Sequence, residues 1–147
     1  MTRMLFVSFV FATACSPGQA KQNGGDVISD YQWEPGDTTP RIQYGEVYCT
    51  TSDSGSVLTF INVQADDPQG ASDLKEGTWS AYRIANDELV VTDVLYCDGQ
   101  ECIYSFHADQ YPEIPCSQLT EFYFLATVVD WSGNETESME LDVLGEL

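Results

Sequence analysis

The stretch LTEFYFLATVVDWSGNETESMELDV, residues 119–143, decides the expected fold. Over residues 122–129 both alternating sets of side chains are mostly bulky, β-branched or apolar, which is typical of a strand covered on both faces in the middle of a sheet. The following DWSGN has turn chemistry, because Gly133 and Asn134 tolerate a positive φ. Residues 139–143 then alternate between apolar and polar, which predicts a strand with one face exposed to solvent. The stretch predicts a β-hairpin that closes an all-β domain.

The chain upstream of this hairpin divides into further short strands separated by turn residues. Apolar alternation or β-branched and aromatic composition marks five more segments, residues 42–49, 57–65, 78–85, 89–97 and 102–108. No long apolar pattern with the 3.6-residue period of a helix appears. The sequence therefore predicts seven strands and an all-β fold class.

The composition is that of a folded and strongly acidic domain. The 147 residues are 43% hydrophobic and 12% aromatic, which allows one domain with a packed core. The net charge is −19, from 24 acidic and 5 basic residues, so nucleic acid and anionic membrane surfaces repel the chain. We expect no nucleic-acid partner. The acidity fits either a solvated surface that resists aggregation or the binding of multivalent cations.

The N-terminus has the features of an export signal. Arg3 precedes an apolar run, residues 4–14, that is too short to span a bilayer. Its end, Ala12-Thr-Ala14, fits the cleavage rule of ordinary signal peptidase. Together with Cys15 it also resembles a bacterial lipobox, in which the cysteine is lipidated and becomes the first residue. Ala12 departs from that pattern, since a lipobox usually has Leu or another larger aliphatic residue there.

The number of cysteines decides between these two cleavage sites. Five cysteines in an exported protein leave one unpaired, whereas lipidation of Cys15 leaves four, enough for two disulfides. Ser16 after the lipidated cysteine resembles the outer-membrane sorting signal of Gram-negative bacteria. We therefore expect residues 1–14 to be a signal peptide and residues 15–41, rich in glycine and proline, to be a lipid-anchored flexible linker. The expected location is the cell envelope, at the outer membrane.

Seven short strands over residues 42–147, with Trp79 on the third, resemble an immunoglobulin-like (Ig-like) or fibronectin-type sandwich. The likeness is closest in residues 63–70 and 126–134, which look like the second strand and last hairpin of the small Ig-like domains of bacterial surface proteins and lipoproteins. It implies two antiparallel sheets packed face to face. Antibody-type domains join the second and sixth strands by a disulfide, and neither strand here has a cysteine. Fibronectin-type domains usually have Tyr where this chain has Phe122, so the subtype stays open.

Strand direction in such a sandwich predicts the cysteine pairing. Cys49 ends the first strand and Cys116 lies in the loop between the fifth and sixth, so both fall at one end of the domain. Cys97 and Cys102 flank a four-residue loop at the other end. We expect the disulfides Cys49–Cys116 and Cys97–Cys102. The first closes a long loop and should stabilise the fold by about 3–4 kcal/mol in the chain-entropy model.

The same arrangement gathers carboxylates, because the loops after the second, fourth and sixth strands share one end of this fold. A Ca²⁺ site there, with Asp66, Asp67, Asp73 and Asp130 as ligands, is the hypothesis that this gathering raises beside ordinary turn chemistry. Carboxylates are the hard oxygen ligands that Ca²⁺ prefers, although the spacing does not match an EF-hand loop. The alternative is that these residues form turns, in which Asp side chains bond their own backbone.

The sequence contains no recognisable set of catalytic residues. His107 is the sole histidine and lies next to a strand end, and with the four remaining cysteines paired we expect neither a histidine-ligated zinc site nor a Cys/His nucleophile. A carboxylate pair for glycoside hydrolysis needs a cleft, which a small sandwich seldom offers. Trp131 beside Gly133 fits either stacking on a sugar ring or covering the end of the sandwich.

The sequence thus predicts a non-catalytic cell-envelope lipoprotein whose Ig-like domain serves as a protein-interaction or structural module. It is not expected to be an enzyme or to need a cofactor, apart from the hypothetical Ca²⁺. Its expected contacts are the membrane, through the lipid, and an envelope protein or glycan. The alternative function is a Ca²⁺-dependent adhesion or glycan-binding module that uses the acidic end.

Overall fold

The computed structural model describes residues 32–146 of the chain. The predicted signal peptide, the predicted lipidation site at Cys15 and most of the predicted linker lie outside the described residues. Within residues 32–146, no helix has both the length and the apolar character needed to cross a membrane.

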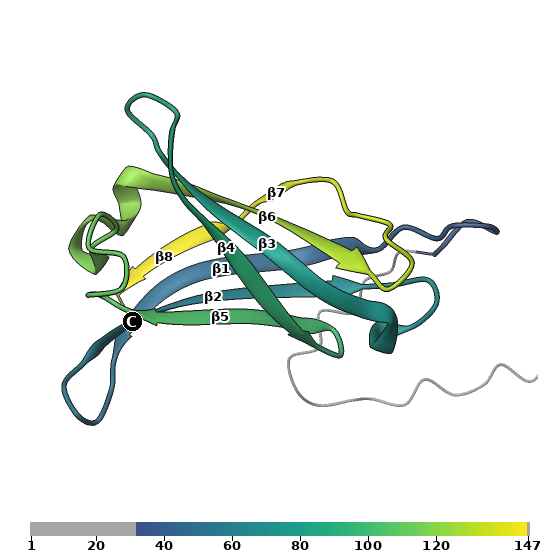
Figure 1. The fold of residues 1–147 in the computed structure, drawn as a ribbon, viewed down its shortest axis with the longest axis horizontal. Coiled ribbons are helices and arrows are strands. Elements are labelled where there is room, and N and C mark those ends of the chain that lie inside the picture. Colours follow the sequence, from purple (N-terminus) through teal and green to yellow (C-terminus); the bar gives the residue numbers. More distant parts are fainter. Residues whose placement is uncertain (1–31, 147) are drawn as a thin grey trace, which may run out of the picture. The chain divides into compact units, whose positions relative to one another are not determined.

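Eight strands and two short 3₁₀ helices follow one another along this part of the chain (Figure 1). The strands are β1 (Arg41–Thr51), β2 (Val57–Asp66), β3 (Leu74–Arg83), β4 (Glu88–Asp98), β5 (Glu101–His107), β6 (Phe122–Asp130), β7 (Met139–Glu140) and β8 (Asp142–Glu146). The helices are η1 (Ala71–Asp73), just before β3, and η2 (Cys116–Glu121), just before β6. The fold is all-β, as predicted, and each predicted strand segment overlaps an observed strand, except that the last one overlaps two. The third strand begins earlier than the predicted residue 78, at Leu74.

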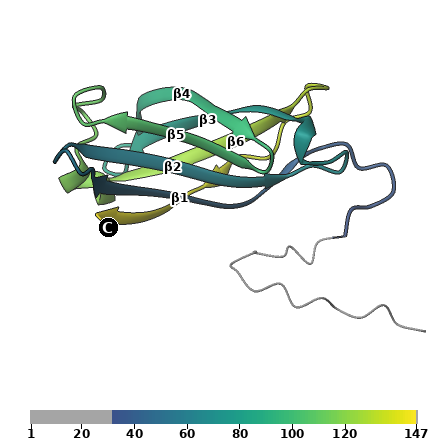
Figure 2. The same cartoon turned by 90° about the horizontal axis from the view of Figure 1, so that it is seen from below.

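The strands are hydrogen-bonded in the order β7-β6-β3-β4-β5-β2-β1-β8. The prediction of seven strands in two separate sheets therefore differs from the structure, which has eight strands in one continuous order. The structure has one order because β4 and β5 pair with each other over three residue pairs next to their turn. These pairs connect the first four strands of the order to the last four by hydrogen bonds. The half β7-β6-β3-β4 packs across the half β5-β2-β1-β8, and Figure 2 shows the strands from a second side.

The predicted last strand is divided at Leu141. β7 pairs with β6, whereas β8 pairs with β1 in parallel, so the C-terminal segment passes from one edge of the strand order to the other. Leu141 is buried, and its N–H donates to the Phe124 carbonyl at 2.9 Å. Gly45 of β1 leaves room for this side chain, because a Cβ at that position would lie 2.4 Å from Leu141 Cδ2. The crossing brings the two outer edges together and makes the sheet nearly a barrel.

Aromatic side chains join the two halves in the core. Trp79 of β3 is fully buried, and its ring stacks on that of Phe106 of β5 with the centroids 5.7 Å apart. Tyr111, from the segment between β5 and η2, meets the same indole edge-on at 5.8 Å, and Phe124 of β6 lies 6.3 Å away. On β6 the residues at alternate positions from Phe122 to Asp130 are buried and the residues between them are half-buried, so both faces are covered as predicted. The predicted position in the middle of a sheet is wrong, because β6 is second in the strand order and its outer neighbour β7 pairs with it over two residues only.

The structure contains the disulfides Cys49–Cys116 and Cys97–Cys102. These are the two pairs that strand direction predicted. The first joins β1 to η2 across a sequence separation of 67 residues, and the second joins β4 to β5 across a separation of 5. In the chain-entropy model the long loop gives about 4 kcal/mol and the short one about 2 kcal/mol.

Asp93 of β4 forms the polar end of the aromatic cluster. The hydroxyl groups of Tyr104 (3.0 Å) and Tyr111 donate to one carboxylate oxygen, and the Val94 main-chain N–H donates to the other at 2.8 Å. The hydrogen bond from Tyr111 lowers the pKa of Asp93 and outweighs the opposing effect of burial. The ionised carboxylate is therefore the form that the fold favours.

Replacing Asp93 by Asn should lower the free energy of unfolding at pH 7 by about 1.5–3 kcal/mol, because an amide accepts these hydrogen bonds less strongly than a carboxylate. The pKa of Asp93 is lower in the folded than in the unfolded state. The stabilisation of the fold by ionised Asp93 is therefore complete above the unfolded-state pKa of about 3.9, and it is lost as the pH falls through the folded-state pKa. Urea unfolding between pH 7 and pH 3 should show a shallower loss of stability in acid for Asp93→Asn.

The matched control for this prediction is Asp98→Asn. Asp98 lies on the same strand and is exposed, so its replacement should leave both the stability and its acid dependence within about 0.5 kcal/mol of the wild type. Parallel acid profiles for Asp93→Asn and the wild type would contradict the role given to the Tyr104 and Tyr111 hydroxyl groups.

Candidate metal centre

The loops that follow β2 and β6 lie at the same end of the domain, together with the β4–β5 hairpin (Figures 1 and 2). The Trp131 N–H donates to the Asp73 carbonyl at 2.9 Å, and Leu74 is the register partner of Asp130. The end of β6 is thus attached to the residues that lead into β3. Strand alternation predicted this shared end.

Three of the four predicted ligands come together here. Asp67, Asp73 and Asp130 each offer a carboxylate oxygen, and these oxygens all lie within 4.8 Å of one another. Asp67 is 3% exposed and Asp130 1% exposed, whereas Asp73 is half-buried. We call these three residues the acidic triad.

Asp66 is not part of the acidic triad, which corrects the predicted ligand set. Its Oδ1 accepts from the Asp67 N–H (2.9 Å) and from Gln100 Nε2 (3.2 Å), and its Oδ2 accepts from Gln43 Nε2 (3.4 Å). Adjacent side chains of an extended chain point to opposite sides. Asp66 and Asp67 therefore face different surroundings, and Asp66 is held by the two glutamines.

Asp130 is well supplied with hydrogen-bond donors. Its Oδ1 accepts from the Asn134 main-chain N–H and its Oδ2 from Asn134 Nδ2, both at 2.7 Å. Burial alone would raise the pKa of Asp130, but these bonds, with main-chain N–H groups of Gly133 and Ser132, outweigh it and lower that pKa. The turn after β6 therefore keeps this carboxylate charged although it is buried.

Asp67 has fewer hydrogen-bond donors than Asp130. Its Oδ1 accepts from the Gln69 N–H at 2.7 Å, an Asx turn of the kind expected from turn chemistry, while its buried Oδ2 has no hydrogen-bond partner. Burial, followed by the charges of Asp73, Asp130 and Asp66, raises the pKa of Asp67, and the Gln69 bond offsets this in part. The predicted turn chemistry therefore accounts for Oδ1 of this residue, whereas Oδ2 has no partner.

The surroundings of the acidic triad include one exposed aromatic ring. Trp131 directly follows Asp130 and is 66% exposed, so it does not cover the end of the sandwich. Lys75 Nζ lies 5.9 Å from the centre of its ring and makes an ion pair with Glu76 at 2.8 Å. All the ligand atoms of the acidic triad are oxygens, a set that suits hard cations rather than zinc or copper.

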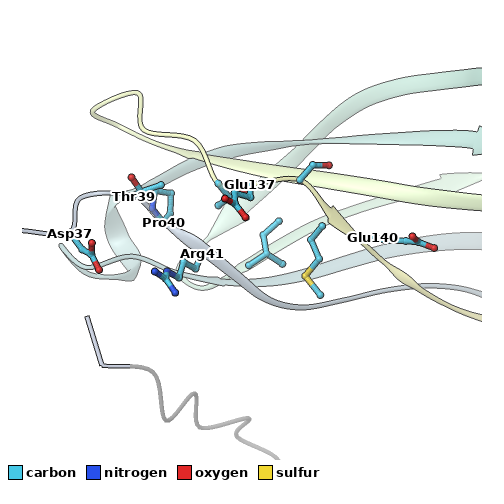
Figure 3. Close-up of a pocket in the computed structure, with 10 residues that line it drawn as sticks. Asp37, Thr39, Pro40, Arg41, Glu137 and Glu140 are labelled. Atoms are coloured by element: carbon cyan, nitrogen blue, oxygen red, sulfur yellow. The ribbon is translucent and has the colours of Figure 1, made fainter. Parts of the chain in front are cut away.

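A pocket of about 710 Å³ lies beside the start of β1 and was not predicted (Figure 3). It is lined by Asp37, Thr39, Pro40, Arg41, Ile42, Thr136, Glu137, Ser138, Met139 and Glu140. Half of these residues precede or begin β1, and the others lie between β6 and β7 or form β7, so no single sequence motif marks the pocket. The Arg41 guanidinium packs over the Trp33 ring at 5.4 Å, which ties the end of the predicted linker to the domain.

An apolar patch is exposed where β4 and β5 pair. Val94, Tyr96 and Ile103 are 37%, 67% and 47% exposed. Val94 and Tyr96 are two positions apart on β4, and Ile103 is the register partner of Tyr96, so all three side chains emerge from one face. We call them the β4–β5 patch.

No protein-family model matches the sequence, and no curated protein matches it. Among solved structures, the chain is similar to the CARDB domain of a protein from Pyrococcus furiosus, crystallised in complex with di-metal ions. The two are 16% identical over 83% of this chain and 100% of that one, with a TM-score of 0.33.

Proposed function

We propose that this chain is a non-catalytic, lipid-anchored module of the bacterial cell envelope whose Ig-like domain binds a partner protein through the β4–β5 patch. The observation that carries the proposal is the exposure of Val94, Tyr96 and Ile103 side by side on a two-stranded surface. Single exposed apolar residues are ordinary, whereas neighbouring ones on one face mark interaction sites. Tyr in particular is enriched at the centres of protein interfaces.

The edge of the patch indicates what kind of surface fits it. Glu76 of β3 is the register partner of Tyr96, while Asp98 and Glu101 continue the same face beyond Tyr96 and Ile103. The patch is therefore apolar in its centre and acidic around it. A partner protein with an apolar contact surface flanked by Lys or Arg would match both features, and its positive charge would speed association with this acidic chain.

The anchor part of the proposal rests on the sequence around Cys15. Lipidation there accounts for the fifth cysteine, since the other four are bonded in the domain. Intact-mass spectrometry of the protein from membranes of a bacterial host should give a chain beginning at Cys15 with added acyl mass. A Cys15→Ser variant should lose this mass and leave the membrane fraction. An unmodified mature N-terminus in the wild type would contradict the anchor.

The patch is tested by site-specific photocrosslinking in the cells that make the protein. A photoreactive phenylalanine analogue at position 96 should give an adduct of defined mass, and the same analogue at position 53 should not. Asp53 is exposed in the β1–β2 hairpin, at the opposite end of the domain from the β4–β5 hairpin (Figure 1). An Ile103→Asp variant should reduce the adduct at least tenfold, because it places a charge at the centre of the contact. Adducts of equal yield from both positions, or no response to Ile103→Asp, would contradict the proposal.

A second candidate function is Ca²⁺-dependent adhesion or glycan binding at the acidic end. The observation that favours it is Trp131, whose exposed ring directly follows a residue of the acidic triad. Stacking of a sugar on this indole should quench tryptophan fluorescence in the presence of Ca²⁺, and a Trp131→Ala variant should lose the response. Trp79 is buried and serves as an internal reference. Quenching that is equal in Trp131→Ala would exclude this candidate.

A further inference from the structure

We propose that Asp67, Asp73 and Asp130 bind a divalent cation of the Ca²⁺ type that joins the loop after β2 to the end of β6. This inference does not rest on the β4–β5 patch, which lies outside the acidic triad. It rests on two separate observations, the approach of three carboxylates and one buried carboxylate oxygen without a partner.

The unpartnered oxygen is what distinguishes the acidic triad from an ordinary acidic loop. Asp67 is 3% exposed, and its Oδ2 makes no hydrogen bond. The backbone of the same loop is held by its own hydrogen bonds, since the Gly70 N–H donates to the Asp67 carbonyl and the Asp73 N–H to the Gly70 carbonyl, both at 2.9 Å. A buried carboxylate oxygen without a donor is rare, because desolvation is then uncompensated. A cation in contact with Oδ2 supplies the missing partner.

The spacing of the three carboxylate oxygens allows all of them to bind one Ca²⁺, and the coordination chemistry of the site favours Ca²⁺ over Mg²⁺. Two oxygens bound to one Ca²⁺ at 2.3–2.6 Å lie at most about 5 Å apart, and the three ligand oxygens lie within 4.8 Å of one another. Mg²⁺ demands a near-ideal octahedron at about 2.0–2.1 Å and dehydrates reluctantly. Three carboxylates leave several coordination positions for water, which the half-buried Asp73 side admits.

The electrostatic repulsion within the acidic triad also favours a bound divalent cation. The acidic triad places three carboxylates together in a chain of net charge −19, and the burial of Asp67 and Asp130 weakens solvent screening of their repulsion. Lys75, two residues after Asp73, makes its ion pair with Glu76. A divalent cation removes most of this repulsion at once. We expect a dissociation constant of about 10⁻⁵–10⁻³ M, as for sites with few carboxylates and several waters.

The cation would connect the two halves of the strand order. Asp67 follows β2, while Asp73 and Asp130 flank the pairing of β3 with β6. At the other end of the domain the Cys49–Cys116 disulfide joins β1 to the start of η2. Metal binding should therefore rigidify the loops that carry Trp131 and leave the β1–β2 hairpin unchanged.

The test is the thermal unfolding of the full chain after EDTA treatment, with and without Ca²⁺ at about 30 mM, which exceeds the highest expected dissociation constant about thirtyfold. Wild-type protein should melt about 5 °C or more higher in saturating Ca²⁺, since a ligand that binds the folded state raises Tm by mass action. An Asp67→Asn variant should lose this shift, yet melt at or above the wild-type temperature in EDTA, because one buried like charge has been removed. A residue that served the turn alone would give a lower Tm in both conditions.

The matched control is Asp66→Asn, which removes the same charge from the neighbouring residue that faces Gln43 and Gln100. It should keep the Ca²⁺ shift. Tb³⁺ added to the metal-free protein should luminesce on tryptophan excitation, with the signal displaced by Ca²⁺ and reduced several-fold in Trp131→Phe. A wild-type Tm that is equal in Ca²⁺ and EDTA, or Ca²⁺ shifts of the same size in Asp67→Asn and Asp66→Asn, would overturn the inference.

Discussion

The contact of the Trp79 indole with the Phe106 ring holds the two halves of the strand order against each other. The two rings are nearly parallel, with an interplanar angle of 2°, and they come from strands of opposite halves. Burial of a Trp side chain removes roughly 150–250 Å² from water, worth about 4–6 kcal/mol at 25 cal/mol per Å². Trp79 Nε1 has no hydrogen-bond partner, which costs about 1–3 kcal/mol. The free energy gained by burying the apolar surface exceeds the cost of the unpartnered Nε1, so the indole remains in the core.

Strand positions could be predicted because burial imposes a two-residue period on the sequence. β6 is the clearest case, since its alternation extends over Phe122–Asp130 without interruption. The break at Leu141 could not be predicted, because it depends on the hydrogen bond to Phe124 and on the space above Gly45, and both partners are distant in sequence. The single hydrogen-bonded order could not be predicted either. It depends on three residue pairs between β4 and β5, and pairing over so short a length does not change the apolar pattern of either strand.

The candidate site was predictable to the level of loops but not of atoms. Strand direction placed Asp67, Asp73 and Asp130 at one end, and it also placed Asp66 there, because direction does not tell which side of the chain a carboxylate faces. Gln43 and Gln100 decide the position of Asp66, and neither belongs to its loop. The unpartnered oxygen of Asp67, the pocket beside β1 and the bonds of Asp93 to two tyrosines likewise arise from contacts between separate segments.

The β4–β5 patch and the acidic triad lie at the same end of the domain but differ in how they are held in place. The patch lies on a hairpin whose strands are joined by Cys97–Cys102 one position from Tyr96 and Ile103, so its side chains are ordered before any partner arrives. Such preorganisation reduces the entropy lost on binding. The loops of the acidic triad have no disulfide and contain buried like charges, so the proposed cation would stabilise them by neutralising those charges. A partner bound at the patch would therefore meet the same surface with or without the proposed cation, whereas any ligand that contacts Trp131 would bind to loops whose rigidity the proposed cation would control.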